Sequence, residues 1–126
     1  MKLWSFKVFI SLNGRDTFHE WITSLDADSE EKVRATIKLL SVSKVWGRPH
    51  FAKLHGWDNL YEIIIKGKDK QYRPLGCYGP GPQIFTLLIG ASKKSKIWTP
   101  SNAIKTADKR RKLVFTNRRY LDDYRL

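Results

Sequence analysis

The chain has 126 residues, of which 41% are hydrophobic and 13% aromatic, so it is long and apolar enough to fold as one domain. Its 24 Lys and Arg against 12 Asp and Glu give a formal net charge of +12, which favours a polyanionic partner. The single cysteine, Cys77, excludes an intramolecular disulfide and fits a reducing cytosol.

The chain opens with an apolar segment that we interpret as a strand. Residues 3–12 are rich in aromatic and β-branched side chains and end at Asn13-Gly14, a turn dipeptide. Lys7 interrupts the apolar run and no small-residue cleavage site follows, which argues against a signal peptide. Because no stretch is long enough to span a membrane, the sequence predicts a cytoplasmic protein.

Two helices are predicted next. Residues 15–25 carry apolar side chains at i, i+3, i+4 and i+7, namely Phe18, Trp21, Ile22 and Leu25. Asp28 and Glu31 have the spacing of a capping box, which predicts a second helix from Asp28 to about Lys44. We expect the two helices to form an αα-hairpin on one face of a sheet.

The centre of the sheet is predicted within residues 54–100, after a connecting loop along residues 45–57. Three extended runs, separated by segments with Gly and Pro, are Leu60–Lys66, Lys70–Tyr78 and Ile84–Ala91. Short connections favour antiparallel neighbours, so the runs predict a three-strand meander. Cys77 fits a small apolar residue inside the second run.

The C-terminal part predicts a short loop along residues 95–100 and a last helix along residues 103–115, capped by Ser101 or Asn102. The tail, residues 116–126, mixes basic and acidic side chains and has no clear periodicity. The expected fold is one α+β domain over residues 1–126. It contains a mostly antiparallel four-stranded sheet, the helix pair on one face, and the C-terminal helix.

The basic excess is uneven along the chain. Residues 1–45 hold 7 basic and 6 acidic side chains, a net of +1, whereas residues 46–126 hold 17 and 6, a net of +11. A single-sign field of this size favours nucleic acid. An anionic membrane surface is the weaker option, because no basic amphipathic helix with a large apolar face stands out.

The chemistry-bearing residues do not form a metal or nucleotide motif. The histidines His19, His50 and His55 do not combine with Cys77 into a ligand spacing, and no P-loop, dinucleotide fingerprint or nucleophile elbow is present. We therefore expect neither a cofactor nor a metal. Lys, Arg, Glu, His and Tyr suit metal-free phosphodiester transfer in RNA, in which a base activates the 2′-OH and cations stabilise the phosphorane.

Two charged residues interrupt the meander. Glu62 alternates with Tyr61 and Ile63 and so lies on the opposite face of its strand, and Arg73 precedes Pro74, which implies a strand edge or bulge. We expect Glu62 and Arg73 to meet across neighbouring strands. The pair is either a structural ion pair or part of a phosphate site.

Four further basic residues frame the meander. Lys53 and His55 precede its first strand, and Lys93 and Lys94 end its last. On their own these residues fit ordinary loop and strand-end positions as well as a phosphate clamp.

The order of these pieces resembles the RelE/HigB toxin superfamily, and most closely its HigB-like, phage-derived branch. The opening strand and helix resemble that branch as well. The residues that carry the resemblance are Leu60-Tyr61-Glu62-Ile63, Gln71-Tyr72-Arg73-Pro74-Leu75, Ile84–Ile89, Ser92–Lys96 with Thr99-Pro100, and Ile104 with Ala107.

The resemblance implies the toxin of a type II toxin–antitoxin pair, an endoribonuclease that cuts ribosome-bound mRNA and arrests growth. Its antitoxin is expected to be a small helix-turn-helix protein, and its products to carry 2′,3′-cyclic phosphate ends. Carried over by motif, Arg73 binds the scissile phosphate, Glu62 is the base and Lys53 is a functional lysine. Basic residues expected to bind RNA or phosphate are Lys93, Lys94, Lys96, His55 and Arg110.

One departure leaves the general acid open. Many relatives carry a His or an aromatic residue near the end of the last meander strand, where this chain has Gly90-Ala91. Tyr120 or Tyr124 of the tail is the candidate substitute. The alternative function is a non-catalytic RNA- or ribosome-binding protein on the same fold. A DNA-binding regulator is disfavoured because no helix-turn-helix signature is present.

Overall fold

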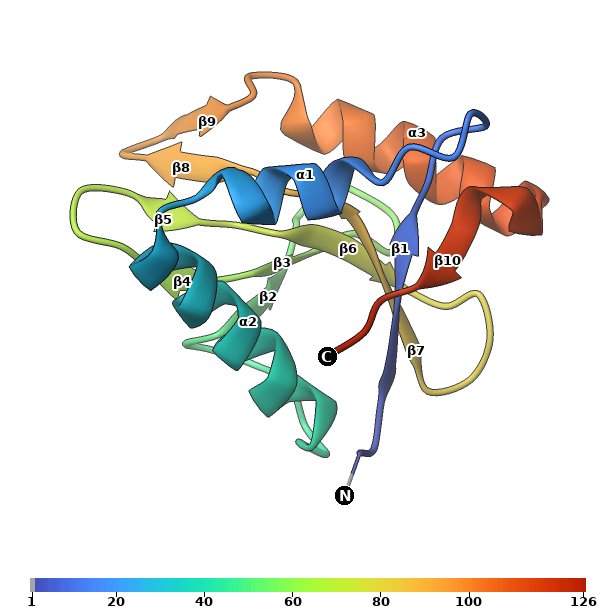
Figure 1. The fold of residues 1–126 in the computed structure, drawn as a ribbon, viewed down its shortest axis with the longest axis horizontal. Helices are drawn as coiled ribbons and strands as arrows, with labels where there is room; N and C mark the ends of the chain where they lie inside the picture. The colour runs from blue at the N-terminus through green and yellow to red at the C-terminus, as the bar shows by residue number, and fades with distance from the viewer. Residues whose placement is uncertain (1) are drawn as a thin grey trace.

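The computed structural model describes residues 2–126, which fold into two β-sheets with helices on both faces of the larger one (Figure 1). The strands are β1 (Ser5–Phe9), β2 (Phe51–Lys53), β3 (Tyr61–Ile63), β4 (Ile65–Lys66), β5 (Gln71–Tyr72), β6 (Leu75–Tyr78), β7 (Ile84–Ile89), β8 (Ser92–Lys94), β9 (Ile97–Thr99) and β10 (Leu121–Asp123). The helices are α1 (Thr17–Ser24), α2 (Ala27–Ser41), α3 (Ala103–Thr116) and the 3₁₀ turn η1 (Arg118–Tyr120).

The predicted meander is confirmed, but it is bent across two sheets. Sheet A has the order β10-β1-β7-β6-β3-β2, and sheet B has the order β4-β5-β8-β9. The first two runs each contribute one strand to each sheet, β3 with β4 and β6 with β5. The third run forms β7 of sheet A and leads directly into β8 of sheet B, which begins just past its predicted end. All pairs within the meander are antiparallel.

The expectation of one mostly antiparallel four-stranded sheet is therefore wrong in detail. β1 pairs with β7 in parallel, which the long intervening chain with its helix pair permits. β2 and β9 lie in segments predicted as loops. β2 pairs antiparallel with β3 at the edge of sheet A, and β9 pairs antiparallel with β8 at the edge of sheet B. These strands have only three residues each, too few for period-2 alternation to be recognised.

The bend of the middle run lies at Arg73-Pro74. Pro74 has no N–H to donate to a ladder, and the Arg73 N–H instead donates to the Ala91 carbonyl at 2.8 Å. The register of β6 against β7 shifts between Leu75 and Gly76. The proline thus marks an irregular site, as the sequence predicts.

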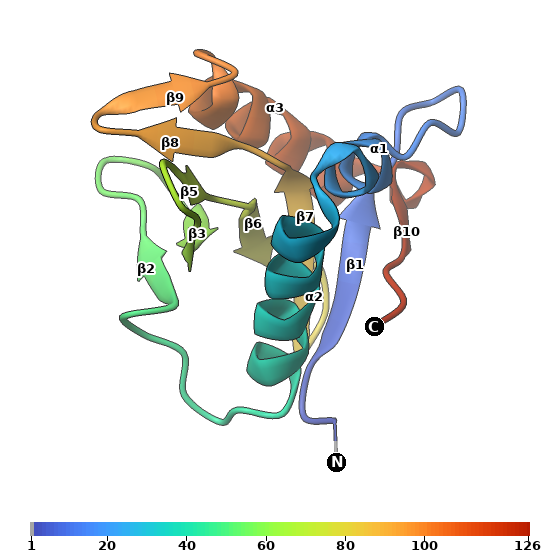
Figure 2. The same ribbon diagram turned by 60° about the vertical axis from the view of Figure 1, so that its left-hand side comes forward.

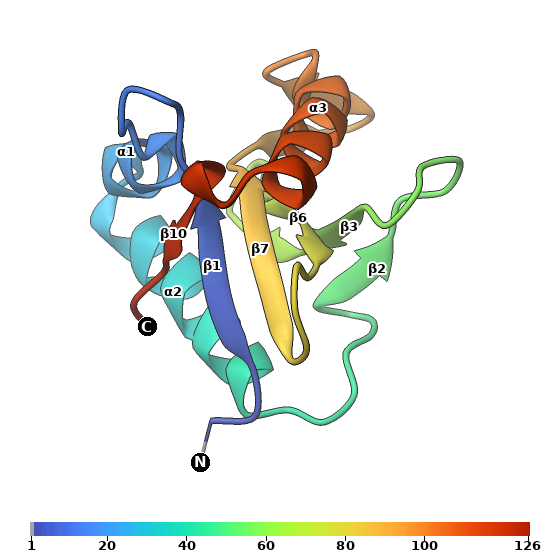
Figure 3. The same cartoon turned by 90° about the vertical axis from the view of Figure 1, so that its right-hand side faces the viewer.

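The helices lie on the two faces of sheet A (Figures 2 and 3). The expected helix pair, α1 and α2, covers one face, where the buried core includes Phe6, Val8, Phe18, Ile22, Val33, Ile37, Phe85 and Leu87. α3 covers the other face, with a second core that includes Leu75, Cys77, Leu88, Ala103, Ala107 and Val114. Burial raises the pKa of Cys77 to about 12, which fits its expected role as a small core residue.

The N-cap of the second helix lies two residues before the predicted one, and the helix itself begins at Ala27. Asp26, and not Asp28, is its N-cap and accepts a hydrogen bond from the Ser29 N–H at 2.8 Å. The Ser29 hydroxyl is buried, donates to Asp26 at 2.9 Å and lies 3.0 Å from the Tyr72 hydroxyl. This contact with sheet B, which the sequence does not reveal, favours the earlier cap.

The tail that had no sequence pattern completes sheet A. β10 pairs antiparallel with β1, and the Lys7 Nζ contacts Asp123 Oδ1 at 2.7 Å. The C-terminus thereby returns to the first strand (Figure 1). Among residues 2–126, no helix combines the length and apolar character needed to cross a lipid bilayer.

Candidate functional site

One face of sheet B presents a continuous row of polar and aromatic side chains. Lys66 of β4 faces Gln71 of β5, Gln71 faces Lys93 of β8, and Lys93 faces Trp98 of β9. Directly paired residues share a face, and Arg73, two residues after Gln71, is placed on that face by the same alternation. We call Lys66, Gln71, Arg73, Lys93 and Trp98 the cationic row.

The opposite face of sheet B explains why this row stays polar. Ile65 and Tyr72, which alternate with the row, are buried in the core beneath α1 and α2. Within the row, the Lys93 Nζ lies 5.1 Å from the centroid of the Trp98 ring, a cation–π distance. The row therefore combines positive charge with an aromatic ring, the two features that single-stranded nucleic acids bind.

Arg73 is held from two sides. Its Nη1 pairs with the Glu62 carboxylate of β3, and its Nε and Nη2 donate to Gln71 Oε1, with an Nε–Oε1 distance of 3.1 Å. The Arg73 and Glu62 side chains are only 12% and 10% exposed. The expected contact between Glu62 and Arg73 is confirmed.

The geometry leaves the arginine with binding capacity. A guanidinium has five N–H donors, and three are engaged by Glu62 and Gln71, which leaves two for an incoming anion. Glu62 places a carboxylate at the same point. A phosphodiester at this position would therefore meet both a cationic fork and a proton acceptor.

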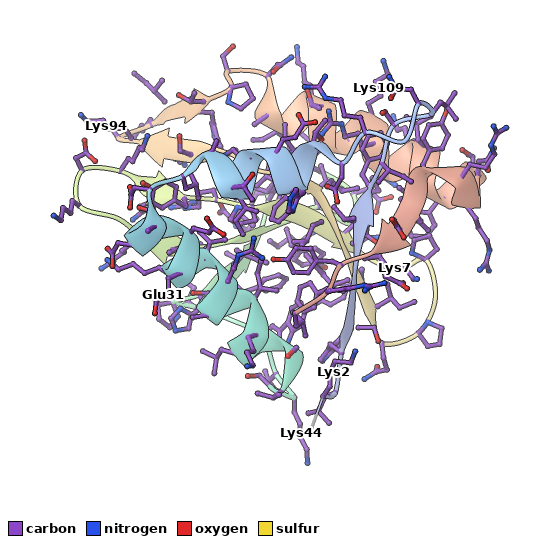
Figure 4. The ribbon with its side chains drawn as sticks, viewed as in Figure 1. Lys2, Lys7, Glu31, Lys44, Lys94 and Lys109 are labelled. Carbon is purple, nitrogen blue, oxygen red and sulfur yellow. The ribbon has the colours of Figure 1, made fainter. Side chains whose placement is uncertain are left out.

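A hollow of about 380 Å³ adjoins the row between the β4–β5 and β8–β9 turns. Gln71 of the row lies in its wall, and the lysines that line it are Lys66, Lys68, Lys70, Lys93 and Lys94. Asp69 is the one carboxylate among its lining residues. We call it the lysine hollow; Figure 4 marks the position of Lys94, one of its lining residues. Five positive charges against one negative concentrate a positive field beside Arg73.

The expected RNA-binding lysines divide between row and rim. Lys93 belongs to the row and Lys94 to the lysine hollow, while Lys96 is exposed in the β8–β9 turn. The last meander run thus carries its lysines to the neighbourhood of Arg73. Their roles in binding RNA remain predictions.

Lys53 and His55 are not brought to Arg73. Lys53 faces Tyr61 across β2 and β3, and alternation places it on the face opposite to Glu62. Its Nζ donates to the Trp57 carbonyl at 3.2 Å and lies 5.2 Å from the Tyr61 ring centroid. His55 and Lys53 both line a second hollow, which is distinct from the lysine hollow. A direct part for Lys53 in chemistry at Arg73 remains a prediction.

Arg110, which was predicted to bind RNA or phosphate, packs against other parts of the protein. Its Nη1 donates to the Leu88 carbonyl at 2.9 Å and to Thr17 Oγ1 at 3.2 Å, and its guanidinium lies 4.7 Å from the Phe9 ring centroid. Burial lowers the pKa of Arg110. These contacts join α3 to β7 and to the start of α1, and the predicted phosphate contact is not tested by them.

The departure at Gly90 has a steric cause. A Cβ atom on Gly90 would overlap the indole of Trp21 from α1. The Trp21 ring is fixed in turn by Phe18, at a centroid distance of 5.5 Å, and by the edge of Tyr72, at 6.5 Å. At Gly90 the fold therefore has no room for the His or aromatic side chain that the RelE/HigB resemblance would lead one to expect there.

The tail does not supply the missing acid. Tyr120 stacks on Phe9 with a centroid distance of 5.8 Å, and Tyr124 packs against Phe18 beside Arg34. Both lie at the β10 edge of sheet A, with β1, β7 and β6 between them and β3. The structure therefore contradicts the expectation that one of these tyrosines replaces the acid beside Glu62.

No functional role was predicted from the sequence for three residues of the cationic row, namely Lys66, Gln71 and Trp98. Alternation along β5 already places Gln71 beside Arg73. Trp98 had no such signal, because its segment was predicted as a loop. Its place opposite Lys93 depends on the β8–β9 hairpin.

Within residues 2–126, no three His, Cys, Asp or Glu side chains are grouped in a way that would hold a metal ion.

A family model described as Phage derived protein Gp49-like (DUF891) matches residues 20–112, a segment that contains Glu62 and the whole cationic row. No curated protein and no solved structure gives a significant match.

Proposed function

We propose that this chain, which belongs to the phage-derived Gp49-like family, is the toxin of a type II toxin–antitoxin pair. In this proposal it is an endoribonuclease that cuts ribosome-bound mRNA without a metal ion. The observation that carries the proposal is the Arg73 guanidinium, held between Glu62 and Gln71 in a cationic row beside the lysine hollow.

The proposed reaction uses the RNA's own 2′-hydroxyl. Glu62 accepts its proton, the 2′-oxygen forms a bond to phosphorus, and the bond from phosphorus to the 5′-oxygen breaks as that oxygen takes up a proton from solvent water. The products are a 2′,3′-cyclic phosphate and a 5′-hydroxyl. Arg73 binds two non-bridging oxygens through its free N–H groups and stabilises their growing negative charge.

The rest of the row positions the RNA. Lys66 and Lys93 offer point charges to neighbouring phosphates, and the Trp98 ring offers a surface on which a base can stack. A stacked base beside a held phosphate fixes the nucleotide next to Arg73. Such positioning is a large part of catalysis when no covalent group is transferred to the protein.

The decisive experiment combines cleavage with end chemistry. Purified protein is treated with EDTA, desalted to protect the ribosomes, and added to ribosomes that carry a labelled mRNA. We expect cleavage at the rate of untreated protein and 2′,3′-cyclic phosphate ends. Fragments with 5′-phosphate ends, or activity that returns only when a transition metal is added back, would contradict the proposed mechanism.

A non-catalytic function on the same fold is the second candidate. The observation that favours it is Gly90 beneath Trp21, which removes the strand-end position of an acid. A protein of this kind would sediment with ribosomes and leave the mRNA intact. Sedimentation and cleavage measured on one sample separate the two functions.

The proposed partner is tested independently of cleavage. A small helix-turn-helix protein encoded beside this chain is expected to restore growth when the two are produced together. Restored growth with formation of a stable complex supports the pair. A neighbour that neither binds the chain nor changes growth would contradict it.

A further inference from the structure

A second hollow, of about 440 Å³, lies beside the edge strand β2. The aromatic residues that line it are Trp46, Phe51, Tyr61 and Tyr78, and the basic residues are Arg48, Lys53 and His55. Tyr61 faces Lys53 and Gly76 in register, so its ring is on the face of sheet A opposite to Glu62. We call this site the aromatic hollow; it is separate from the cationic row.

Its rings are fixed by their neighbours. Tyr61 stacks on Phe51 with a centroid distance of 5.2 Å and an interplanar angle of 9°, and Tyr78 stands edge-on to Tyr61 at 4.9 Å. The Trp46 Nε1 donates to the carbonyls of Leu40 at 2.9 Å and Ser43 at 3.1 Å. A planar ligand would therefore meet aromatic surfaces that are already ordered.

Its charge is of one sign. Arg48, Lys53 and His55 are exposed at the hollow, and none of the residues that line it is acidic. Burial and the neighbouring Tyr61 raise the pKa of Tyr78 to about 12, so its hydroxyl stays neutral and does not repel an anion. The volume lies within the range of about 300–1,000 Å³ that is usual for small-ligand sites.

We propose that the aromatic hollow binds one nucleotide of single-stranded RNA. The base stacks on the face of Tyr61 that Phe51 leaves uncovered, with Tyr78 edge-on beside it. The phosphate lies against Arg48 and Lys53, whose ammonium moves off the Tyr61 ring to meet it. This combination of rigid aromatic rings and exposed positive charge is the usual chemistry of single-strand binding. The inference rests on the composition of the hollow and not on cleavage, and it gives Lys53 and His55 a role in binding, away from Arg73.

The charge is tested with a fluorescent oligouridylate, whose binding is followed by anisotropy over a range of salt concentrations. Arg48→Gln/Lys53→Gln should weaken binding, and the slope of log K against log[salt] should become shallower by about 0.7, because both side chains contact the same phosphate and each phosphate contact on a single strand contributes about that much. The matched control is Lys105→Gln/Lys109→Gln, which removes two exposed charges of α3. We expect the control to keep the wild-type slope.

The rings are tested separately. Tyr61→Phe keeps the stacking surface and should bind as the wild type does, whereas Tyr61→Leu should bind roughly 5- to 150-fold more weakly, the usual effect of losing one stacked base. Thermal melting of both variants reports whether they are folded. If Tyr61→Leu does not fold, the wild-type protein decides the point after photo-crosslinking to an oligonucleotide that carries 4-thiouridine.

Crosslinks at Tyr61, Tyr78 or Trp46 support the proposal. Crosslinks confined to the cationic row, together with unchanged binding by Arg48→Gln/Lys53→Gln, would overturn it, as would a wild-type protein that does not bind the oligonucleotide. Oligonucleotide binding and crosslinking are both measured without any cleavage step. Failure of the proposed cleavage is therefore distinguishable from failure of this inference.

Discussion

The stability of the fold and the proposed chemistry depend on the same guanidinium at Arg73. Its partner Glu62 is almost buried, and a buried carboxylate that loses its cation destabilises a protein by about 3–5 kcal/mol. Arg73→Ala would therefore lose cleavage through unfolding as readily as through lost catalysis. Variants that keep a positive charge beside Glu62, or that remove both charges together, are needed to separate the two effects.

Arg73→Lys keeps a positive charge beside Glu62, so we expect a melting temperature near that of the wild type. Its ammonium lacks the planar fork, and cleavage should fall roughly a hundred- to a thousand-fold, as when one oxyanion donor is removed. Melting and cleavage are measured on one preparation. The control is Arg73→Met/Glu62→Leu, which removes both charges at similar volume and should fold without cutting. If this double variant folds and cuts at the wild-type rate, Arg73 does not belong to the active site.

Alternation predicted the contact between Glu62 and Arg73 because both lie in or beside runs long enough to show their period. It did not predict the place of Lys53, whose three-residue strand was interpreted as a loop. The engagement of Arg110 was equally hidden, because its partners Leu88 and Thr17 come from distant parts of the chain. The position of a single residue can thus be predicted from the sequence only when the strand that carries it can be predicted.

At the scale of elements, the fold depends on how closely α1 approaches the bend between β7 and β8. The indole of Trp21 lies where a side chain at Gly90 would be, so helix and strand are in contact through the glycine. This contact also fixes Tyr72, which forms part of sheet B. The bend that carries Lys93 toward Arg73 is therefore supported from the α1 side.

Gly90→Ala tests this contact. The new methyl group must displace Trp21, and we expect a loss of about 1–3 kcal/mol, the usual cost of overpacking a core. At roughly 4 °C per kcal/mol, the melting temperature should fall by about 4–12 °C. Gly47→Ala is the matched control, because nothing lies within 4 Å of the Cβ it would add. Equal melting temperatures for the two variants would show that Trp21 moves aside without cost.

The elements that the sequence predicted are those with enough residues to show a period: the three helices, the first strand and the three runs of the meander. The strands β2, β9 and β10 have three residues each and exist because β3, β8 and β1 offer them unpaired edges. Only Pro74 signalled where a run leaves one sheet for the other. The division into two sheets is a tertiary feature that periodicity does not contain.

For the molecule as a whole, charge and sites come from the same part of the chain. The cationic row, the lysine hollow and the aromatic hollow are all built from residues 46–98, within the segment that carries a net charge of +11. Residues 1–45, with a net of +1, supply β1 and the helix pair over one face. The fold thus separates a nearly neutral support from a basic surface.

Binding to ribosomes or RNA should consequently weaken steeply as salt is added. If Lys66, Arg73 and Lys93 each neutralise one phosphate of a single strand, and Arg48 and Lys53 together neutralise a fourth, the slope of log K against log[salt] is about −2.8. The slope is measured by titrating labelled RNA at several chloride concentrations and again with glutamate as the anion. Lys109, which projects from α3 in Figure 4, provides the control, because Lys109→Gln removes a charge outside all three sites and should leave the slope unchanged. A wild-type slope near zero would mean that the basic surface does not bind a polyanion, and the argument from charge to RNA would fail.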